Sequence, residues 1–451
     1  MEGFNDKDYF SRLPNELVEA ILVDARIRGP PTKRFLPIFR RNLYRRIFLR
    51  SYESLHLLTR TAHSHPEFLE ETKEFTLDVL SADEDNVDAD PKVLTDDELL
   101  SFLKSLTRVH TLEINGSQRL GQIAFHTKSP LPCFATVKTL HLEFPTHDVN
   151  GKYDYFDPVE FIQSLSRYTA LVSLYFATSP ATPPRWRDYP EEPDMSQLPS
   201  LDRITTLHLG GGSLCNVPTL SYLAPHLPSL TDITFDNSVE DRSSDEIFEF
   251  LRYIPNPDLV TTLSLLFDDV NEAAAVNLVD IISHFTNLGD LSLQNLPMET
   301  VYPHLSSLPL RRLTFNHNPT LSTATISRLL SGPNKITTLE TLCLDNFFAS
   351  EGDPIPDHYY PSNVSRDIAY RWGWLLADWT RAFSEKGLGE LEALGKREGI
   401  KVEGQAFHAI EVEALWQKAL DVQHQARLER DEDSDDGSEY QIPDTASHQH
   451  R

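Results

Sequence analysis

The stretch ITTLHL at residues 204–209 decides the fold, because its pattern of apolar residues recurs along the chain. In each copy, an apolar residue is followed at +3 and +5 by two more. With the middle apolar residue as reference, the nine copies lie at Leu112, Leu140, Leu174, Leu207, Ile233, Leu263, Leu291, Leu313 and Leu342. The first and last lie 230 residues apart over eight intervals. A period of about 29 residues is typical of a repeat array.

Segments between these runs carry the apolar spacing of helices, as in Phe161, Ile162 and Leu165 or Ile326, Leu329 and Leu330. Alternate residues of a strand point to opposite faces of a sheet, so the apolar residues of each run face a common core. One such unit buries its apolar face only by stacking on the next unit. The sequence therefore predicts an α/β solenoid, with parallel strands inside and helices and loops outside.

The repeat resembles the leucine-rich repeat, whose consensus is L-x-x-L-x-L-x-x-N/C-x-L. LRRLTFNHN at 310–318 carries the consensus asparagine at Asn318, whereas most other copies lack it. The resemblance covers about 109–346, and a weaker copy, KEFTLD at 73–78, extends the predicted horseshoe to 74–346. A run of unrelated βα units in an open parallel sheet is the alternative that the regular period disfavours.

A second resemblance lies near the N-terminus. The pattern Leu13-Pro14-x-Glu16-Leu17-x-x-x-Ile21 resembles the opening of the F-box, a small helical module that docks on the adaptor of cullin–RING ubiquitin ligases. The resemblance implies that these five residues bind the adaptor, and that residues 11–73 form an F-box-like module and its linker. The family's second apolar helix is missing, because only VDARIRGPPT at 23–32 precedes the linker. The module is therefore a shortened one.

The N-terminal block has its own charge balance. Residues 1–73 carry a net charge of +3, whereas the rest of the chain sums to −30. PIFRRNLYRRIF at 37–48 is predicted to form an amphipathic helix with an arginine-rich outer side. A nucleic-acid or membrane patch is the alternative, and the total charge of −27 disfavours it because both partners repel a negative surface.

The remaining regions are predicted from composition. Residues 1–10 form a flexible N-terminus, and the proline-rich stretch 178–200 replaces a helix between two strands. Residues 347–428 form a C-terminal cap that begins with one helix at 366–386, although its aromatic cluster could instead line a ligand site. Residues 429–451 form a disordered acidic tail.

No feature of the sequence points to catalysis. Cys133, Cys215 and Cys343 are isolated, so neither a disulfide framework nor a cysteine metal site is expected. No catalytic or phosphate-binding motif, signal peptide or membrane-length apolar stretch occurs. We therefore expect a non-enzyme without metal or cofactor, acting in the cytoplasm or nucleus as a monomer within a complex and binding neither nucleic acid nor membrane.

Two functions follow from these expectations. In the first, the chain is an F-box-type substrate-recognition subunit of a cullin–RING ubiquitin ligase, and its leucine-rich repeats bind a target protein that is marked for ubiquitin-dependent degradation. In the second, the repeats form a protein-binding scaffold that has no ligase docking.

The target is predicted to bind where ring side chains gather. His141, Tyr175 and His208 each follow the reference residue of successive runs, and strands in a sheet are about 4.8 Å apart, so the rings are expected to be adjacent. Trp186 lies in the loop that leaves the strand of Tyr175 and completes the predicted target-binding set. A featureless sheet rich in Ser and Thr is the alternative.

Overall fold

The computed structural model describes part of the chain. The described residues are 44–79, 94–116, 118–127, 129–144, 158–178, 197–210, 220–237, 245–267, 272–294, 296, 298–316, 318, 321–345, 347–349, 380–383, 385–404 and 407. The predicted adaptor-binding residues Leu13, Pro14, Glu16, Leu17 and Ile21 lie outside them, as do Trp186, the acidic tail and most of the predicted cap.

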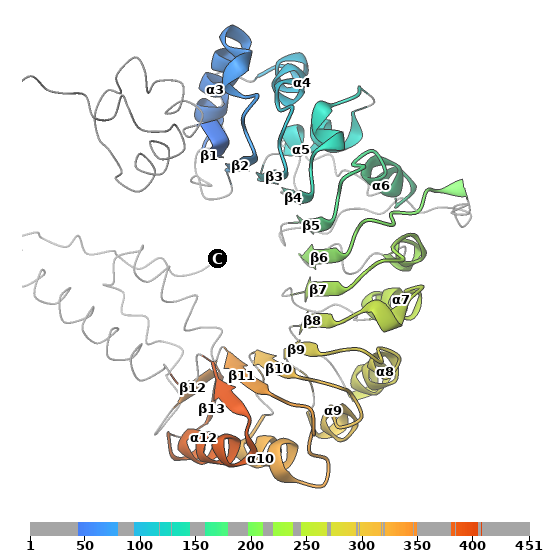
Figure 1. Ribbon diagram of the computed structural model, residues 1–451, viewed down its shortest axis with the longest axis vertical. Helices are drawn as coiled ribbons and strands as arrows, with labels where there is room; N and C mark the ends of the chain where they lie inside the picture. The colour runs from blue at the N-terminus through green and yellow to red at the C-terminus, as the bar shows by residue number, and fades with distance from the viewer. Residues whose placement is uncertain are drawn as a thin grey trace, which may run out of the picture.

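The strands form one open sheet in which all twelve run parallel and neighbours follow the order of the chain. In Figure 1 they line the inner side of an arc, and the helices lie on its outer side. This architecture is compatible with an α/β solenoid. The strands in sheet order are β1 (Arg46–Leu49), β2 (Glu74–Asp78), β3 (Thr111–Asn115), β4 (Thr139–Phe144), β5 (Ser173–Thr178), β6 (Thr206–Gly210), β7 (Asp232–Asn237), β8 (Thr262–Phe267), β9 (Asp290–Gln294), β10 (Arg312–Asn316), β11 (Thr341–Asp345) and β14 (Lys401–Glu403).

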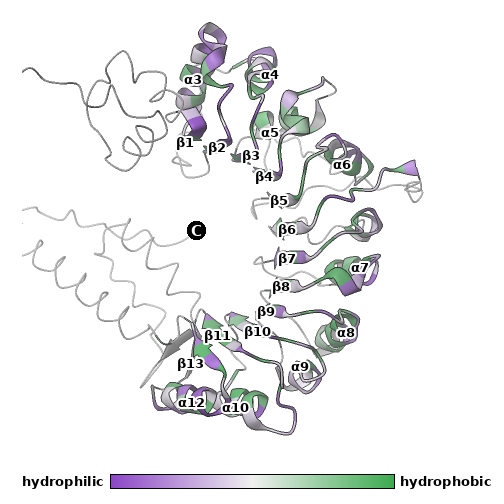
Figure 2. Ribbon diagram, viewed as in Figure 1, coloured by the Kyte–Doolittle hydropathy of each residue, from purple (hydrophilic) through white to green (hydrophobic). Residues whose placement is uncertain are grey.

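Helices connect most of the successive strands that the structure describes. The α-helices are α3 (Tyr52–Ser64), α4 (Asp96–Ser105), α5 (Gln118–His126), α6 (Pro158–Leu165), α7 (Asp245–Arg252), α8 (Glu272–Ile282), α9 (Met298–Leu305), α10 (Thr323–Ser331) and α12 (Glu385–Glu398). Short 3-10 turns complete the connections at η2 (Pro66–Phe68), η4 (Pro132–Ala135), η6 (Leu220–Tyr222), η7 (Ala224–His226) and η8 (Pro257–Leu259). In Figure 2 helices such as α4 and α10 carry both hydrophobic and hydrophilic residues, as amphipathic helices do.

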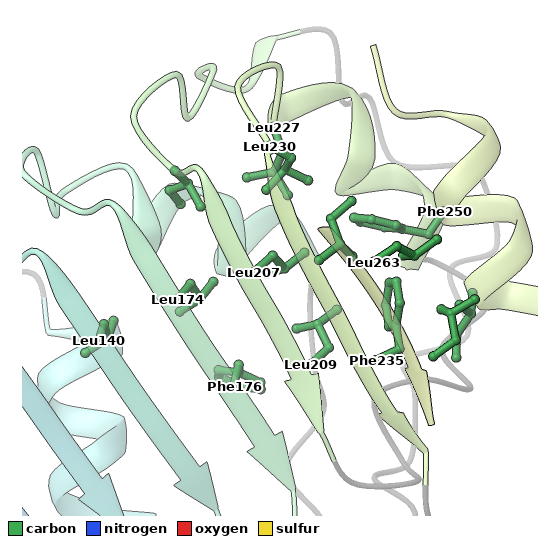
Figure 3. Packing of buried hydrophobic residues seen from close by; sticks show 14 of the residues in the cluster. Leu140, Leu174, Phe176, Leu207, Leu209, Leu227, Leu230, Phe235, Phe250 and Leu263 are labelled. Carbon is green, nitrogen blue, oxygen red and sulfur yellow. The ribbon is translucent and has the colours of Figure 1, made fainter. Parts of the chain in front are cut away.

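The register confirms the predicted repeat. All nine reference residues are aligned across neighbouring strands, and Phe75 of β2 extends the same line. Figure 3 shows Leu140, Leu174 and Leu207 side by side on successive strands. Each of these three leucines is fully buried. Burying one such side chain contributes roughly 1.5–3 kcal/mol, so this line is a major source of stability.

Aromatic side chains fill the space between the sheet and the helices. Phe75 of β2 meets Phe102 of α4 edge to face, with ring centroids 5.2 Å apart. Phe235 of β7 meets Phe250 of α7 in the same way at 5.3 Å. The core is therefore one continuous layer between strands and helices, and no helix in the described part of the chain lies on the opposite side of the sheet. We call that opposite side the inner face.

One buried asparagine joins two repeats. Asn318 is fully buried, and its side-chain amide donates a hydrogen bond to the carbonyl oxygen of Leu296 at 3.0 Å. Leu296 lies in the preceding unit, so this hydrogen bond joins a buried side chain to the backbone of a neighbouring repeat.

The sheet is longer than the predicted repeat region 74–346 at both ends. At the start, the predicted helix 37–48 was wrong for its last residues, because Arg46–Leu49 is a strand paired with β2. Burial alternates along this strand: Ile47 is buried, whereas Arg46 and Phe48 are exposed. At the other end, β14 pairs with β11.

The predicted helix 366–386 was also wrong for residues 380–383, whereas residues 385–386 are helical. Thr380–Phe383 is the strand β13, which pairs in parallel with β12 (Phe347–Ala349) in a separate two-stranded sheet. The helix of this region, α12, starts later and packs against α10. No helix in the described part of the chain is long and apolar enough to cross a bilayer.

Candidate functional site

Three ring side chains lie in line on the inner face. His141 of β4, Tyr175 of β5 and His208 of β6 are direct register partners. The ring centroids of His141 and Tyr175 are 3.7 Å apart, and those of Tyr175 and His208 are 4.1 Å apart. We call these three residues the ring ladder. The predicted adjacency of the rings is confirmed, their role in binding stays a prediction, and Trp186 lies outside the described residues.

The local sequence explains why the rings point away from the helices. Each ring follows a buried leucine of the repeat and precedes another buried apolar residue, so strand alternation places it on the inner face. Parallel strands in register then bring the same repeat position of each unit side by side. The ladder is therefore a product of the repeat period.

A carboxylate continues the line at one end of the ring ladder. Glu113 of β3 is the register partner of His141, and its Oε1 lies 3.5 Å from Nδ1 of His141. The hydroxyl of Thr76 donates to Oε2 of Glu113 at 3.0 Å, and the amide of Asn115 donates to Oε1 at 3.0 Å. Three neighbours thus fix the orientation of this carboxylate.

A second line of residues runs beside the ring ladder, two positions further along each strand. It contains Asp78, Asn115, Glu143, Ala177, Gly210 and Asp236, which are aligned across β2–β7. Its small members make room for the rings. A Cβ on Gly210 would lie 3.4 Å from the Tyr175 hydroxyl and 3.6 Å from Nε2 of His208. The polar tips of both rings therefore lie over this glycine.

Burial disfavours the charged form of all three rings. It raises the pKa of Tyr175 to about 12, and the charges of Glu143, Asp236 and Glu113 add to the effect. Burial also lowers the pKa of His141, although Glu113 opposes this, and it lowers the pKa of His208, although Asp236 opposes it. A neutral His141 that donates its Nδ1–H toward Glu113 leaves Nε2 as an acceptor.

The carboxylates beside the rings disfavour one another's charge. Burial raises the pKa of Glu143, and the nearby carboxylates of Asp78 and Glu113 raise it further. Like charges held close together in a half-buried place are unfavourable, and such arrangements gather at functional sites. The inner face therefore holds carboxylates in this region whose negative charges repel one another.

The second half of the inner face is different in character. The position that carries the rings in β4–β6 is occupied by Ser264, Ser292, Thr314 and Cys343 in β8–β11. Burial raises the pKa of Cys343 to about 12, and its thiol donates to Asp345 at 3.1 Å. This cysteine is therefore a protonated thiol and a poor nucleophile.

Two other types of site are weaker candidates. Among the described residues, no group of three or more His, Cys, Asp or Glu side chains is arranged to hold a metal ion. On the outer side, a shallow hollow of about 270 Å³ is lined by Asp96, Asp97, Leu100, Ile123 and Thr127. It contains no buried polar side chain. The ring ladder and its carboxylates are the stronger candidate site.

Sequence reasoning missed the second line of this site. Asp78, Asn115, Glu143 and Asp236 follow the ring position by two residues in their own strands, so the repeat alignment contains the signal. No protein-family model matches the chain, and no curated protein is significantly similar to it. The basis for a functional proposal is therefore the inner face together with the sequence motifs.

Proposed function

We propose that the chain is an F-box-type substrate-recognition subunit of a cullin–RING ubiquitin ligase, and that it binds its target through the inner face of a leucine-rich-repeat horseshoe. The observation that carries the proposal is the ring ladder. It presents two imidazoles and a phenol side by side, on a face that no described helix covers. Tyrosine combines a large contact area with a polar end, as interface anchors do.

The repeat subclass is part of this proposal. A parallel sheet whose reference residues align in every repeat supports it, and so does the hydrogen bond from Asn318 to the preceding unit. The consensus asparagine of the leucine-rich repeat plays this part at the turn after the strand. The chain supplies positioning in this proposal, and the chemistry of transfer belongs to partner subunits.

The docking half of the proposal rests on sequence alone. Leu13, Pro14, Glu16, Leu17 and Ile21 fit the opening of the F-box, and an adaptor would contact this segment. Two apolar residues four apart, Leu17 and Ile21, lie on one face of such a helix.

A protein-binding scaffold without ligase docking is the second candidate, and one observation favours it. β1 begins at Arg46 and pairs with β2, and α3 connects the two strands, so the last part of the predicted module and linker at 11–73 belongs to the repeat array. Residues 46–49, 52–64 and 74–78 then serve the array and are not part of a separate docking module.

Co-purification with the ligase adaptor separates the two candidates. The intact chain should recover the adaptor at micromolar concentrations, and Leu17→Asp or Ile21→Asp should abolish recovery. Asn15→Asp is the matched control, because it adds the same charge to the same segment without removing an apolar side chain. If the intact chain never recovers the adaptor, the ligase proposal fails and the scaffold remains.

Target binding is tested separately at the ring ladder. A target found by pull-down should bind at least about 1–2 kcal/mol more weakly to Tyr175→Ala or Trp186→Ala, as expected when an anchor is truncated. Adaptor recovery by both variants should be unchanged. Unchanged target affinity in folded variants would place the site elsewhere.

A further inference from the structure

The charged side chains on the inner face of β2–β7 are all acidic, apart from the histidines. Its eighteen aligned positions include six carboxylates and no Lys or Arg: Glu74, Asp78, Glu113, Glu143, Asp232 and Asp236. Glu74 has a cationic partner, because Arg46 of β1 lies 3.0 Å away. None of the other five pairs with a Lys or Arg of the described residues. This surface therefore presents negative charge that the described chain does not neutralise.

A buried acceptor without a donor lies inside the carboxylate cluster. Asn115 is aligned between Asp78 and Glu143 and is only 8% exposed. Its amide nitrogen donates to Glu113, but its Oδ1 has no hydrogen-bond partner among the described residues. The buried Nε2 atoms of His141 and His208 lack partners in the same sense. An unsatisfied buried acceptor such as Oδ1 of Asn115 is costly, and a ligand that brings N–H donors would satisfy it.

The ligand must therefore be positively charged and rich in donors. A metal ion is disfavoured, because no three or more His, Cys, Asp or Glu side chains of the described residues are arranged so that they could hold one. Lysine carries three N–H donors and arginine five, and neither accepts a hydrogen bond. Both also have an aliphatic stem that packs along aromatic rings while the charged end reaches a carboxylate.

We infer that the inner face of β2–β7 binds an extended basic segment of the target protein, with lysine or arginine side chains seated at the carboxylates on either side of the ring ladder. The inference deepens the proposed function and rests on its target-binding half. One seat lies at Asp78, Glu113 and Glu143, and the other lies at Asp232 and Asp236. The ring ladder between them contacts the stems and the intervening peptide.

The register sets the spacing of the two basic residues. The seats are centred on β3 and β7, which are four strand intervals apart, or about 19 Å at about 4.8 Å per interval. An extended peptide advances about 3.3 Å per residue. Two basic residues about six positions apart therefore reach both seats.

Peptides of defined spacing test this inference on the full chain. The probe is a fluorescent Gly/Ser peptide with two lysines six positions apart, and its binding is followed by fluorescence anisotropy at fixed salt. Acetylation of both lysines removes their charge with little change in size and should weaken binding at least tenfold. A peptide with the two lysines adjacent should bind at least threefold more weakly than the spaced peptide.

Matched variants separate a built site from the general attraction of an acidic protein. The double variant Glu143→Gln with Asp236→Asn removes one carboxylate from each seat. It should bind the spaced peptide at least tenfold more weakly than the intact chain does. Glu390→Gln with Glu392→Gln removes the same charge from exposed positions of α12 and should change affinity less than twofold. Equal losses in the two pairs, or no loss in the first, would overturn the inference.

A folding check and an independent control complete the design. If the double variant fails to fold, the single variant Asp236→Asn replaces it in the measurement. This single variant should still bind the spaced peptide several-fold more weakly than the intact chain does. Adaptor co-purification by the same variants should be unaffected. If the chain binds the peptide but does not recover the adaptor, ligase docking alone is contradicted. If the chain recovers the adaptor but does not bind the peptide, the basic-segment site alone is contradicted.

Discussion

At the scale of single residues, His141 and His208 are expected to make the stability of the folded chain depend on pH. Burial lowers the pKa of each in the folded chain below the ordinary value of 6.5, so the unfolded chain binds their protons first. The groups facing them are Glu113 and Asp78 for His141, and Asp236 for His208, with Tyr175 between the rings. Stability should therefore fall as the pH is lowered from about 6.5 toward the folded pKa values.

The histidine contribution is isolated by difference. Denaturant unfolding of the intact chain and of His208→Gln should show a smaller loss of stability on acidification in the variant. His63→Gln, at an exposed position of α3, should leave the dependence unchanged. A variant that loses as much stability as the intact chain would show that His208 does not titrate in this way.

The carboxylate of Glu143, which we infer to bind the basic segment, is expected to lower the stability of the folded chain. Its pKa is raised in the folded chain by burial and by the charges of Asp78 and Glu113, so folding disfavours its charged form at pH 7. Glu143→Gln should therefore raise the melting temperature at pH 7, and the gain should disappear as the pH falls below the folded pKa. Glu392→Gln, at an exposed position, should have little effect. A lower melting temperature for Glu143→Gln would mean that this carboxylate has a stabilising partner.

Strands and helices show how a repeat distributes its stability. Leu207 lies in the middle of β6 and is fully buried between two aligned reference residues. Leu207→Ala should lower the free energy of unfolding by about 2–5 kcal/mol, because it removes buried methyl groups and leaves a cavity. Thr206→Ala, on the inner face of the same strand, should change it by about 0.5 kcal/mol or less. Denaturant unfolding measures both, and equal effects would contradict the burial pattern.

The central strands were predictable from sequence because their period is unambiguous. Runs such as VKTLHL repeat one spacing of apolar residues and alternate over their last four residues, so they fix both the strand and the face that each side chain occupies. The terminal strands were not predictable in this way. RIFL at 46–49 offers a single buried residue, Ile47, and adjoins a segment whose apolar spacing also fits a helix. Pairing with β2 decides its conformation, and the local sequence does not contain that information.

The same reason explains which part of the candidate site was predictable. The rings share one repeat position, so alignment of the runs was enough to bring His141, Tyr175 and His208 together. The carboxylate cluster depends on the burial and register of particular strands. Asp78, Asn115 and Glu143 are far apart in the chain and resemble ordinary polar residues until β2, β3 and β4 are paired.

At the scale of the whole molecule, each unit of the array is stabilised by contacts with its neighbours, so the loss of one unit should destabilise only the units next to it. The C-terminal end of the described array is covered by β14, which pairs with β11, and by α12, which packs against α10. The ammonium of Lys335 lies 2.7 Å from Oε2 of Glu398 and joins α12 to the unit before it. These elements belong to the region that the sequence predicted as a cap.

Removal of residues 385–451 should therefore loosen the end of the array and spare its beginning. It uncovers the edge of β11 and the side of α10 that α12 contacts, so amide hydrogen exchange should accelerate in β10, β11 and α10. Exchange in β3–β5, which lie several units away, should be unchanged. Removal of residues 429–451 alone is the control, and it should leave exchange in every described strand as it was. Faster exchange throughout the sheet after the longer deletion would show that the array unfolds as one unit and that stability does not depend on nearest neighbours alone.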